Sequence, residues 1–194
     1  MYKIVFEPWI GSQVSNVNNK VLVLGESHYG DVSPEDWHDF TNYIVNKFLR
    51  YKSGNEKHEH WMNTFTRFSN VVTSNMDIPM DTNEFWNSII FYNYIQRPLY
   101  SSRIAPTQEE FINSAKAFEA LVAIHKPTEI IVWGKRLWDY LRSNNILTLD
   151  ELNNQYFITN NDGLNTSKIY HVYHPSSSYF NYAYWSNLKR KIKL

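Results

Sequence analysis

Four short segments of the chain carry side chains that could do chemistry, and each follows a run of apolar residues. The first segment reads Gly25-Glu26-Ser27-His28-Tyr29. It offers a carboxylate, a hydroxyl, an imidazole and a phenol in succession, and a carboxylate such as that of Glu26 can act as a general base or position a water molecule. Glu26 could equally cap a helix or bind the amides of its own loop. The segment therefore gains meaning only if other reactive groups lie beside it.

The second segment is 93–97, at the end of the apolar run 88–94. The side-chain amide of Asn93 carries both a hydrogen-bond donor and an acceptor. It could therefore read the edge of a pyrimidine, where a ring N–H lies beside a carbonyl. The alternative is an asparagine that forms a turn by bonding its own backbone.

The third segment is the glycine-containing turn 134–136, which leads from the apolar run 129–133 into a predicted helix. The N-terminus of that helix could attract an anion, because its first amide groups have no partner within the helix. Gly134 could also serve architecture alone, by letting the helix pack closely against a sheet.

The fourth segment follows the last apolar run and reads His174-Pro175-Ser176-Ser177-Ser178. The proline and the serines predict a tight loop whose hydroxyls and amides could bind phosphate. His174 could donate a hydrogen bond to a developing anion or carry a proton. A lone histidine is more often structural, but this one stands at the end of a predicted strand and before such a loop. We therefore interpret it as a functional residue.

The elements that must position these segments can be read from the pattern of apolar residues. Short runs rich in β-branched and aromatic residues predict buried strands, and amphipathic stretches between them predict helices. Alternation of this kind predicts a mostly parallel sheet with helices on both faces. In such folds the ligand lies beyond the carboxyl ends of the strands, so we expect the four segments to meet there. The predicted strands are 20–24, 88–94, 129–133 and 168–173.

Local signals place the helices between these strands. Thr107 and Glu110 form a capping box, after which an apolar stripe recurs at helical spacing until Pro127 ends the element. Ser33 followed by Pro34 predicts a helix that runs to about Arg50. Further helices are predicted at 56–75, 135–142 and 179–192, and loops at 97–106 and 153–167.

The composition limits the class of protein. A chain of 194 residues with 43% hydrophobic residues is expected to form a single domain, 1–194, with a full core. It contains 0 cysteines, which excludes disulfides, thiolate nucleophiles, zinc–thiolate sites and iron–sulfur clusters. We also expect no metal and no cofactor.

The net charge bears on whether the protein binds DNA, and the hydropathy of the sequence bears on its location in the cell. With 19 basic and 19 acidic residues the net charge is zero, whereas a DNA-coating protein is usually basic. A local basic patch could still contact DNA, and the chain has one near its end at Lys189, Arg190, Lys191 and Lys193. No apolar run approaches the roughly 20 residues of a membrane span, and the N-terminus has no apolar signal core. We expect a cytoplasmic, monomeric protein that does not enter membranes.

The segments VLVLGES, FYNYIQRP, VWGK and HPSSS, in this order, resemble the uracil-DNA glycosylase superfamily. The resemblance runs from about Lys20 onward as a skeleton of short motifs, while 50–87 matches nothing in it and is interpreted as a helical insertion of unknown role. It implies a three-layer α/β/α sandwich around a central four-stranded parallel sheet. It also implies DNA as partner, with a flipped base held at the strand ends.

The resemblance implies a role for each candidate residue. Glu26 and Ser27 would handle the attacking water, Asn93 would read the base, and His174 would bind the oxygen of the leaving base and stabilise its anion. Tyr29 would gate the pocket against the C5 substituent of the base. Other contacts to the substrate would come from Gly25 and His28 beside the base, and from Pro175, Ser176 and Ser177 on the DNA backbone. The wedge position falls at Ser178, with Tyr179 or Phe180 as a substitute.

Departures from the family pattern leave alternatives open. In the best-known branch an aspartate stands where this chain has Ser27, and a proline stands where it has His28. A branch whose motif begins with Gly-Glu often carries a four-cysteine cluster, which this chain cannot form. The leading interpretation is a DNA glycosylase that hydrolyses the N-glycosidic bond of uracil or another modified base. The alternative is an inactive protein of the same fold that binds nucleic acid or a nucleobase-like ligand.

A third interpretation is an esterase-like or metal-binding pair formed by Glu26 and His28, to which His58 and His60 could add ligands. Two histidines at i and i+2 diverge on a helix. Because a helix is predicted over 56–75, we do not favour this site. His38 and His125 are interpreted as structural or surface residues, and Trp133 and Trp138 as core.

Overall fold

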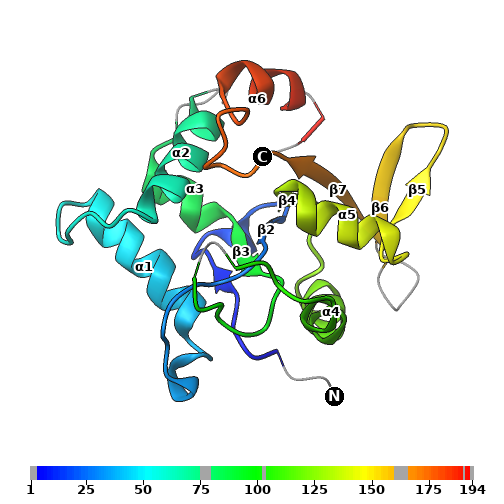
Figure 1. Ribbon diagram of the computed structural model, residues 1–194. Coiled ribbons are helices and arrows are strands. Elements are labelled where there is room, and N and C mark those ends of the chain that lie inside the picture. The colour runs from blue at the N-terminus through cyan, green and yellow to red at the C-terminus, as the bar shows by residue number, and fades with distance from the viewer. Residues whose placement is uncertain (1–3, 75–79, 102–103, 160–165, 190, 193–194) are drawn as a thin grey trace.

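The computed structural model describes residues 4–74, 80–101, 104–159, 166–189 and 191–192. Within these residues the chain is an α/β protein with one seven-stranded mixed sheet, six α-helices and two short 3-10 helices (Figure 1). Arg190 and Lys193 of the predicted basic patch lie outside the described residues, as do residues 75, 102–103 and 160–165 of the predicted helix and loops.

The centre of the sheet is parallel, as predicted. The strand order is β1-β3-β2-β4-β7-β6-β5, and the middle four strands pair in parallel. Strands β3, β2 and β4 are buried throughout, because helices cover both faces of the sheet; this is why they appear in the sequence as continuous apolar runs. The four core strands are β3 (Ile90–Asn93), β2 (Val21–Gly25), β4 (Glu129–Trp133) and β7 (Thr166–Val172).

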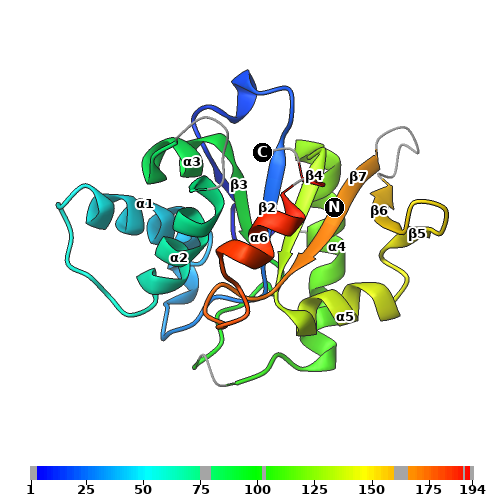
Figure 2. The same cartoon turned by 90° about the horizontal axis from the view of Figure 1, so that it is seen from above.

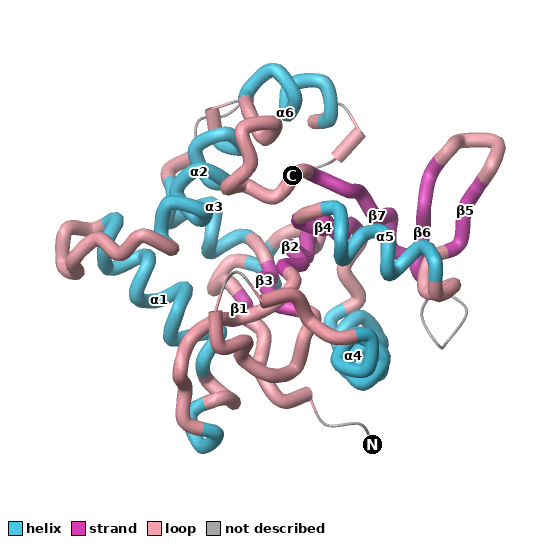
Figure 3. The backbone as a smooth tube through the Cα atoms, in the orientation of Figure 1, coloured by secondary structure: helices cyan, strands magenta, loops and turns pink. Residues whose placement is uncertain are grey.

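The prediction of only four strands was wrong, because three antiparallel strands extend the sheet. Strand β1 (Trp9–Ile10) pairs with β3 at one edge. Strand β6 (Gln155–Thr159) pairs with β7, and β5 (Thr148–Asp150) forms the other edge. Thus β6 and the start of β7 occupy part of the predicted loop 153–167. The hairpin β5–β6 projects from the body of the molecule (Figure 3). Strand β5 is mostly exposed and therefore lacks the apolar run by which the buried strands were predicted.

Successive residues of the central strands face opposite sides of the sheet, which creates two cores. Leu22 and Leu24 contribute to the first core, and Val21 and Val23 to the second. Helices α4 (Gln108–His125) and α5 (Lys135–Ser143) cover the first face (Figure 2). The second face is covered by α1 (Phe40–Lys52), α2 (Met62–Thr73), α3 (Thr82–Ser88) and α6 (Tyr182–Leu188).

Helix α4 follows its sequence signals closely. The capping box of Thr107 and Glu110 is formed in both directions. Of the predicted apolar stripe, Phe111, Phe118 and Val122 are buried, and the fourth position packs against the same core. The helix ends at His125, two residues before Pro127, as predicted.

Other helix boundaries differ from the prediction. The predicted start at Ser33 opens only a 3-10 turn, Pro34–Asp36, and α1 begins later, at Phe40. Helix α6 ends at Leu188 and α2 starts at Met62, so both are shorter than predicted. A second 3-10 turn lies at Val14–Asn16. No helix in the described part of the chain is long and apolar enough to cross a membrane.

The second core is built largely of aromatic rings, and it gives the segment 50–87 a structural role. Phe68 of α2 is fully buried, with its ring centroid 4.7 Å from that of Trp133 and 5.8 Å from that of Phe180. Trp86 of α3 packs against Phe91 of the sheet at 5.5 Å. The segment therefore forms one face of the core, and its packing connects the sheet to the loop that follows β7.

Candidate functional site

The four predicted segments come together at the carboxyl ends of the parallel strands. Gly25 and Asn93 are register partners at the ends of β2 and β3. Glu26, the next residue, forms an ion pair with Arg136 at the start of α5, just after β4. A Cβ atom placed on Gly134 would lie 3.6 Å from the Cβ of His174, the second residue after β7.

The side chain of Asn93 lies directly over Gly25. A Cβ atom on Gly25 would be 2.0 Å from Oδ1 of Asn93, so only glycine leaves room for the amide in this position. Asn93 is 7% exposed, and no residue in the described part of the chain hydrogen-bonds to its side-chain amide. Because the amide has no partner among these residues, a ligand that offers one acceptor and one donor would pair with both of its polar atoms.

His174 is held in a defined tautomer by the loop that follows it. The backbone N–H of Ser176 donates to Nδ1 of His174 at 3.2 Å, and the Ser176 hydroxyl lies 2.7 Å from the same atom. A backbone N–H can only donate, so Nδ1 is the acceptor and the neutral ring carries its proton on Nε2. Desolvation lowers the pKa of His174 below its usual value, and the charge of Glu26 opposes this only in part. The ring is therefore a neutral Nε2–H donor near neutral pH.

The tight loop predicted after His174 is present. The Ser177 N–H donates to the carbonyl of His174 at 2.8 Å, and Pro175 is buried beneath the turn. The hydroxyl-bearing residues Ser176 and Ser178 are exposed. The loop thus holds the imidazole through Ser176, while His174, Ser176 and Ser178 all remain exposed to solvent.

Glu26 is engaged by Arg136 through both carboxylate oxygens. Nε of Arg136 donates to Oε2 at 2.7 Å, and a terminal nitrogen donates to Oε1. The Glu26 side chain is 12% exposed and that of Arg136 is 50% exposed. The hydrogen bond to Glu26 is the main cause of the raised pKa of Arg136. Each carboxylate oxygen keeps one lone-pair site with which to hold a water molecule.

Ser27 and Tyr29 flank this carboxylate. The Ser27 hydroxyl is buried and has no hydrogen-bond partner among the residues that the structure describes. Tyr29 is 39% exposed. Ser27 therefore has a buried, uncommitted hydroxyl next to Glu26 in the sequence, and Tyr29 is partly open to solvent.

His28 belongs to the core, which differs from the substrate contact that the family resemblance implied. Its ring centroid lies 4.9 Å from those of Phe6 and Phe40, and Nε2 lies 2.9 Å from Oγ1 of Thr41. Burial lowers the pKa of His28 to about 3. The residue is thus a neutral core histidine, and the structure does not bring its ring to the site.

Backbone hydrogen bonds continue the pairing of β2 and β3 beyond their ends, and this holds the first segment in place. Three N–H groups of the second loop donate to carbonyls of the first, and one N–H group of the first donates back, at distances of 2.8–3.0 Å. The bonds run from Tyr94 to Gly25, from Ile95 to Glu26, from Leu99 to His28 and from Gly30 to Leu99. The functional groups of 25–29 are therefore carried by a paired segment.

The structure separates the candidates for the wedge. Phe180 is fully buried and packs on Phe68, so it is not available to enter DNA. Tyr179 is 67% exposed, with its ring 5.3 Å from that of Tyr173. Ser178 is exposed as well. Tyr179 is the large side chain that projects from this loop.

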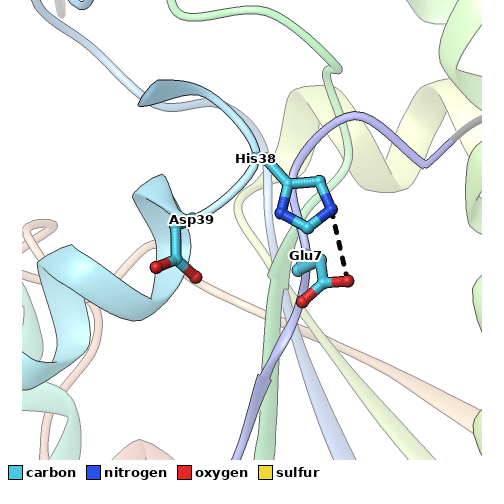
Figure 4. A group of neighbouring side chains, drawn as sticks. All are labelled: Glu7, His38 and Asp39. Carbon is cyan, nitrogen blue, oxygen red and sulfur yellow. Dashed lines mark ion pairs between the residues drawn. The ribbon is translucent and has the colours of Figure 1, made fainter. Parts of the chain in front are cut away.

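Potential metal ligands occur elsewhere and do not form a built site. Glu7, His38 and Asp39 have ligand atoms within 4.8 Å of one another, but all three residues are exposed (Figure 4). Nε2 of His38 lies 3.3 Å from a carboxylate oxygen of Glu7, as in an ordinary surface ion pair. We assign no metal to this group.

The structure also places the two histidines of the third interpretation. Residues 56–60 form a loop, so the predicted helix at this point was wrong. His58 is committed to Asn63, whose Oδ1 lies 2.9 Å from Nε2 of His58. Neither His58 nor His60 belongs to a cluster of potential ligands in the described residues.

One residue of the site received no specific role from the sequence. Arg136 was noted only as part of the glycine turn, although it binds Glu26 across 110 positions of the chain. The sequence signal for Arg136 was a cation in the first turn of the helix that follows β4, while the neighbouring strand β2 is followed by the acid Glu26.

No protein-family model matches this sequence, and no curated protein matches it.

Proposed function

We propose that the protein binds a nucleobase at the carboxyl ends of β2, β3, β4 and β7 and hydrolyses the bond between that base and its deoxyribose. This is the activity of a DNA glycosylase with a uracil-DNA glycosylase-like α/β/α fold. The observation that carries the proposal is His174, held as a neutral Nε2–H donor at the same sheet edge as the uncommitted amide of Asn93.

The chemistry of the reaction fits these groups. Breaking an N-glycosidic bond leaves negative charge on the base and oxocarbenium character on the sugar. A fixed donor such as Nε2–H of His174, aimed at an oxygen of the leaving base, stabilises that negative charge. The base must leave the helical stack to reach such a donor. The amide of Asn93 then recognises its edge through one donor and one acceptor.

The attacking water would be held by the first segment. Glu26 keeps free lone-pair sites at the end of β2, and the buried Ser27 hydroxyl that follows it has no partner among the described residues. As the water oxygen bonds to the sugar C1′, the bond from C1′ to the base breaks and its electron pair leaves with the base. Glu26 accepts the proton of the water, and the base anion later takes a proton from solvent.

One observation favours a second function, which is binding without hydrolysis. Both oxygens of Glu26 already accept hydrogen bonds from Arg136. A carboxylate held in this way serves as a structural anchor as well as it serves as a base. In that case Asn93 and His174 would recognise a base or a nucleobase-like ligand, and no bond would be broken.

Base release from modified oligonucleotides distinguishes the two functions. Oligonucleotides that contain uracil, hypoxanthine, xanthine or a 5-hydroxymethyl pyrimidine are incubated with protein in excess. Alkali then breaks each strand from which a base has been released, and these strand breaks are measured. We expect release by the wild-type protein and a loss of about 10²- to 10³-fold in His174→Ala, the typical effect of removing one such donor. His125→Ala is the matched control, because His125 ends α4 and precedes the amino end of β4.

Glu26→Gln tests the role of the acid in the same assay. If Glu26 activates water, the variant should lose about 10²- to 10⁴-fold in rate. Release that is unaffected by Glu26→Gln would remove Glu26 from the chemistry. Absence of release from every substrate would favour the binding function, and release that survives in His174→Ala would refute the assignment of the leaving-group donor.

A further inference from the structure

A depression of about 390 Å³ lies between α2 and the start of α6, next to the loop that carries His174. Helix α2 lines it with polar residues at positions 63, 66, 67 and 70, a spacing that puts them on one face. Phe180 and Tyr182 line the opposite side. The family resemblance assigns no role to this helix.

Arg67 is the charged group of this depression, and its environment is unusual among the arginines that the structure describes. The others are engaged: three form ion pairs with glutamates, and one lies over an aromatic ring. Arg67 is half-buried, and none of the described residues gives it a carboxylate or a ring. The engaged pairs are Arg50 with Glu56, Arg97 with Glu110, Arg136 with Glu26, and Arg142 over Tyr156.

A half-buried guanidinium without a partner gains from an anion. Charge-assisted hydrogen bonds to phosphate are roughly twice as strong as neutral ones, and arginine fits phosphate through two donors at once. The neighbouring Asn70 has an exposed side chain whose amide can donate to the same anion. The depression thus combines an apolar surface, which includes Val71 and Tyr182, with two groups that can bind a phosphate, Arg67 and Asn70.

The depression continues the candidate site along the chain. Phe180 lies two residues after Ser178, and its N–H donates to the carbonyl of Ser177 at 3.1 Å. The depression thus begins within a few residues of Ser176 and Ser177, so a strand bound at the serine loop would have the depression next to it. Exposed aromatic side chains stand along this path, since Tyr179 is 67% exposed and Tyr182 is 54% exposed.

We infer that the depression binds an unpaired DNA strand beside the nucleotide in the site, with a phosphate on Arg67 and a base stacked on Tyr182. This inference rests on the proposed function for the choice of DNA. Exposed tyrosines favour an unpaired strand, because its bases have free faces on which to stack, whereas those of a duplex are already stacked. We therefore expect the protein to prefer single-stranded DNA as its substrate.

Equilibrium binding to unmodified DNA tests this inference. A labelled single-stranded oligonucleotide and the same sequence as a duplex are titrated with protein, and anisotropy is read over about 50 to 200 mM salt. We expect the wild-type protein to bind the single strand more tightly. Arg67→Ala should weaken that binding about tenfold at the lower salt and reduce the slope of log affinity against log salt by about 0.7, the value for one phosphate of a single strand.

Further variants separate charge, stacking and stability. Arg142→Ala makes the same change of charge on α5, which covers the other face of the sheet, and should leave affinity and slope unchanged. Arg67→Lys should keep most of the salt slope, since a phosphate contact needs the positive charge. Tyr182→Ala should weaken single-strand binding about tenfold with the slope unchanged, as expected for lost stacking. Thermal unfolding of each variant confirms that it is folded.

Three results would overturn the inference: Arg67→Ala that binds like wild type, a duplex bound more tightly than the single strand, or no binding of either DNA at low salt. The assay needs no base release, so it fails independently of the proposed function. If the protein releases a base but Arg67→Ala binds single-stranded DNA as tightly as wild type, only the inference about the depression is refuted. Single-strand binding through Arg67 without base release refutes only the hydrolysis.

Discussion

Replacing Gly25 with alanine tests the central geometry of the site, because the structure leaves no room for a side chain there. The new Cβ would lie 2.0 Å from Oδ1 of Asn93, whereas ordinary contact begins at 3.4 Å, so the amide must move by about 1.4 Å. The next atoms are Cγ of Asn93 at 3.2 Å and Cζ of Phe91 at 3.6 Å. The side chain of Asn93 is therefore the group that must yield.

The size of the effect follows from these contacts. Gly25 is not among the residues with positive φ, so alanine adds no backbone strain. Inserting a methyl group into a packed site costs about 1–3 kcal/mol, and movement of a single side chain puts Gly25→Ala near 1–2 kcal/mol. For a protein of this size this lowers the melting temperature by about 2–4 °C per kcal/mol. In an Asn93→Ala background the clash is gone, and the cost of Gly25→Ala should vanish.

A double-mutant cycle measures this coupling. Urea unfolding of the wild type, both single variants and the double variant gives the interaction free energy, which we expect to be about 1–2 kcal/mol. Costs that add within about 0.5 kcal/mol would refute the placement of the Asn93 amide over Gly25. Both single variants should also lose base binding, since one displaces the amide and the other removes it.

Three further predictions concern the stability of the fold that carries the site. Phe68→Ala should cost about 3–5 kcal/mol in urea unfolding, because the ring is fully buried among other rings. Thr107→Ala should cost about 1 kcal/mol through loss of the capping box, whereas Thr148→Ala on the exposed edge strand should stay within about 0.5 kcal/mol. The low pKa of His28 means that the unfolded chain binds a proton first as pH falls, so stability should drop between pH 6.5 and about 3, by at most about 5 kcal/mol. His28→Gln should show a shallower decline in urea unfolding over the same pH range, and an equal decline would contradict this assignment.

The sequence was informative where burial leaves a local pattern. Strands β2, β3 and β4 are buried along their whole length, so each appeared as an apolar run. The start of helix α4 was predicted correctly because the capping box that marks it is formed by residues close together in the sequence. Strand β5 was missed because an exposed edge strand carries polar residues, and its pairing with β6 cannot be read from composition.

The candidate site was predictable through topology more than through residue types. The rule that parallel strands present their carboxyl ends at one edge brought Asn93 and His174 together. The burial of His28 was not predictable, because a histidine in a polar loop looks reactive until its surroundings are known. Glu26 and Arg136 pair although they are 110 positions apart in the sequence, and such a contact cannot be predicted from local sequence patterns.

The order of strands in the sheet has a consequence for how the site comes into being. Of the strands that the structure describes, β7 comes last in sequence, yet it lies beside β4 in the parallel core, and His174 follows it. A growing polypeptide can form β2, β3 and β4 before β7 has been made, but that intermediate has Asn93 and Glu26 without the imidazole. The four segments can therefore meet only after β7 has been synthesised and has paired with β4. A chain that has been made only as far as β4 thus holds the amide and the acid without His174.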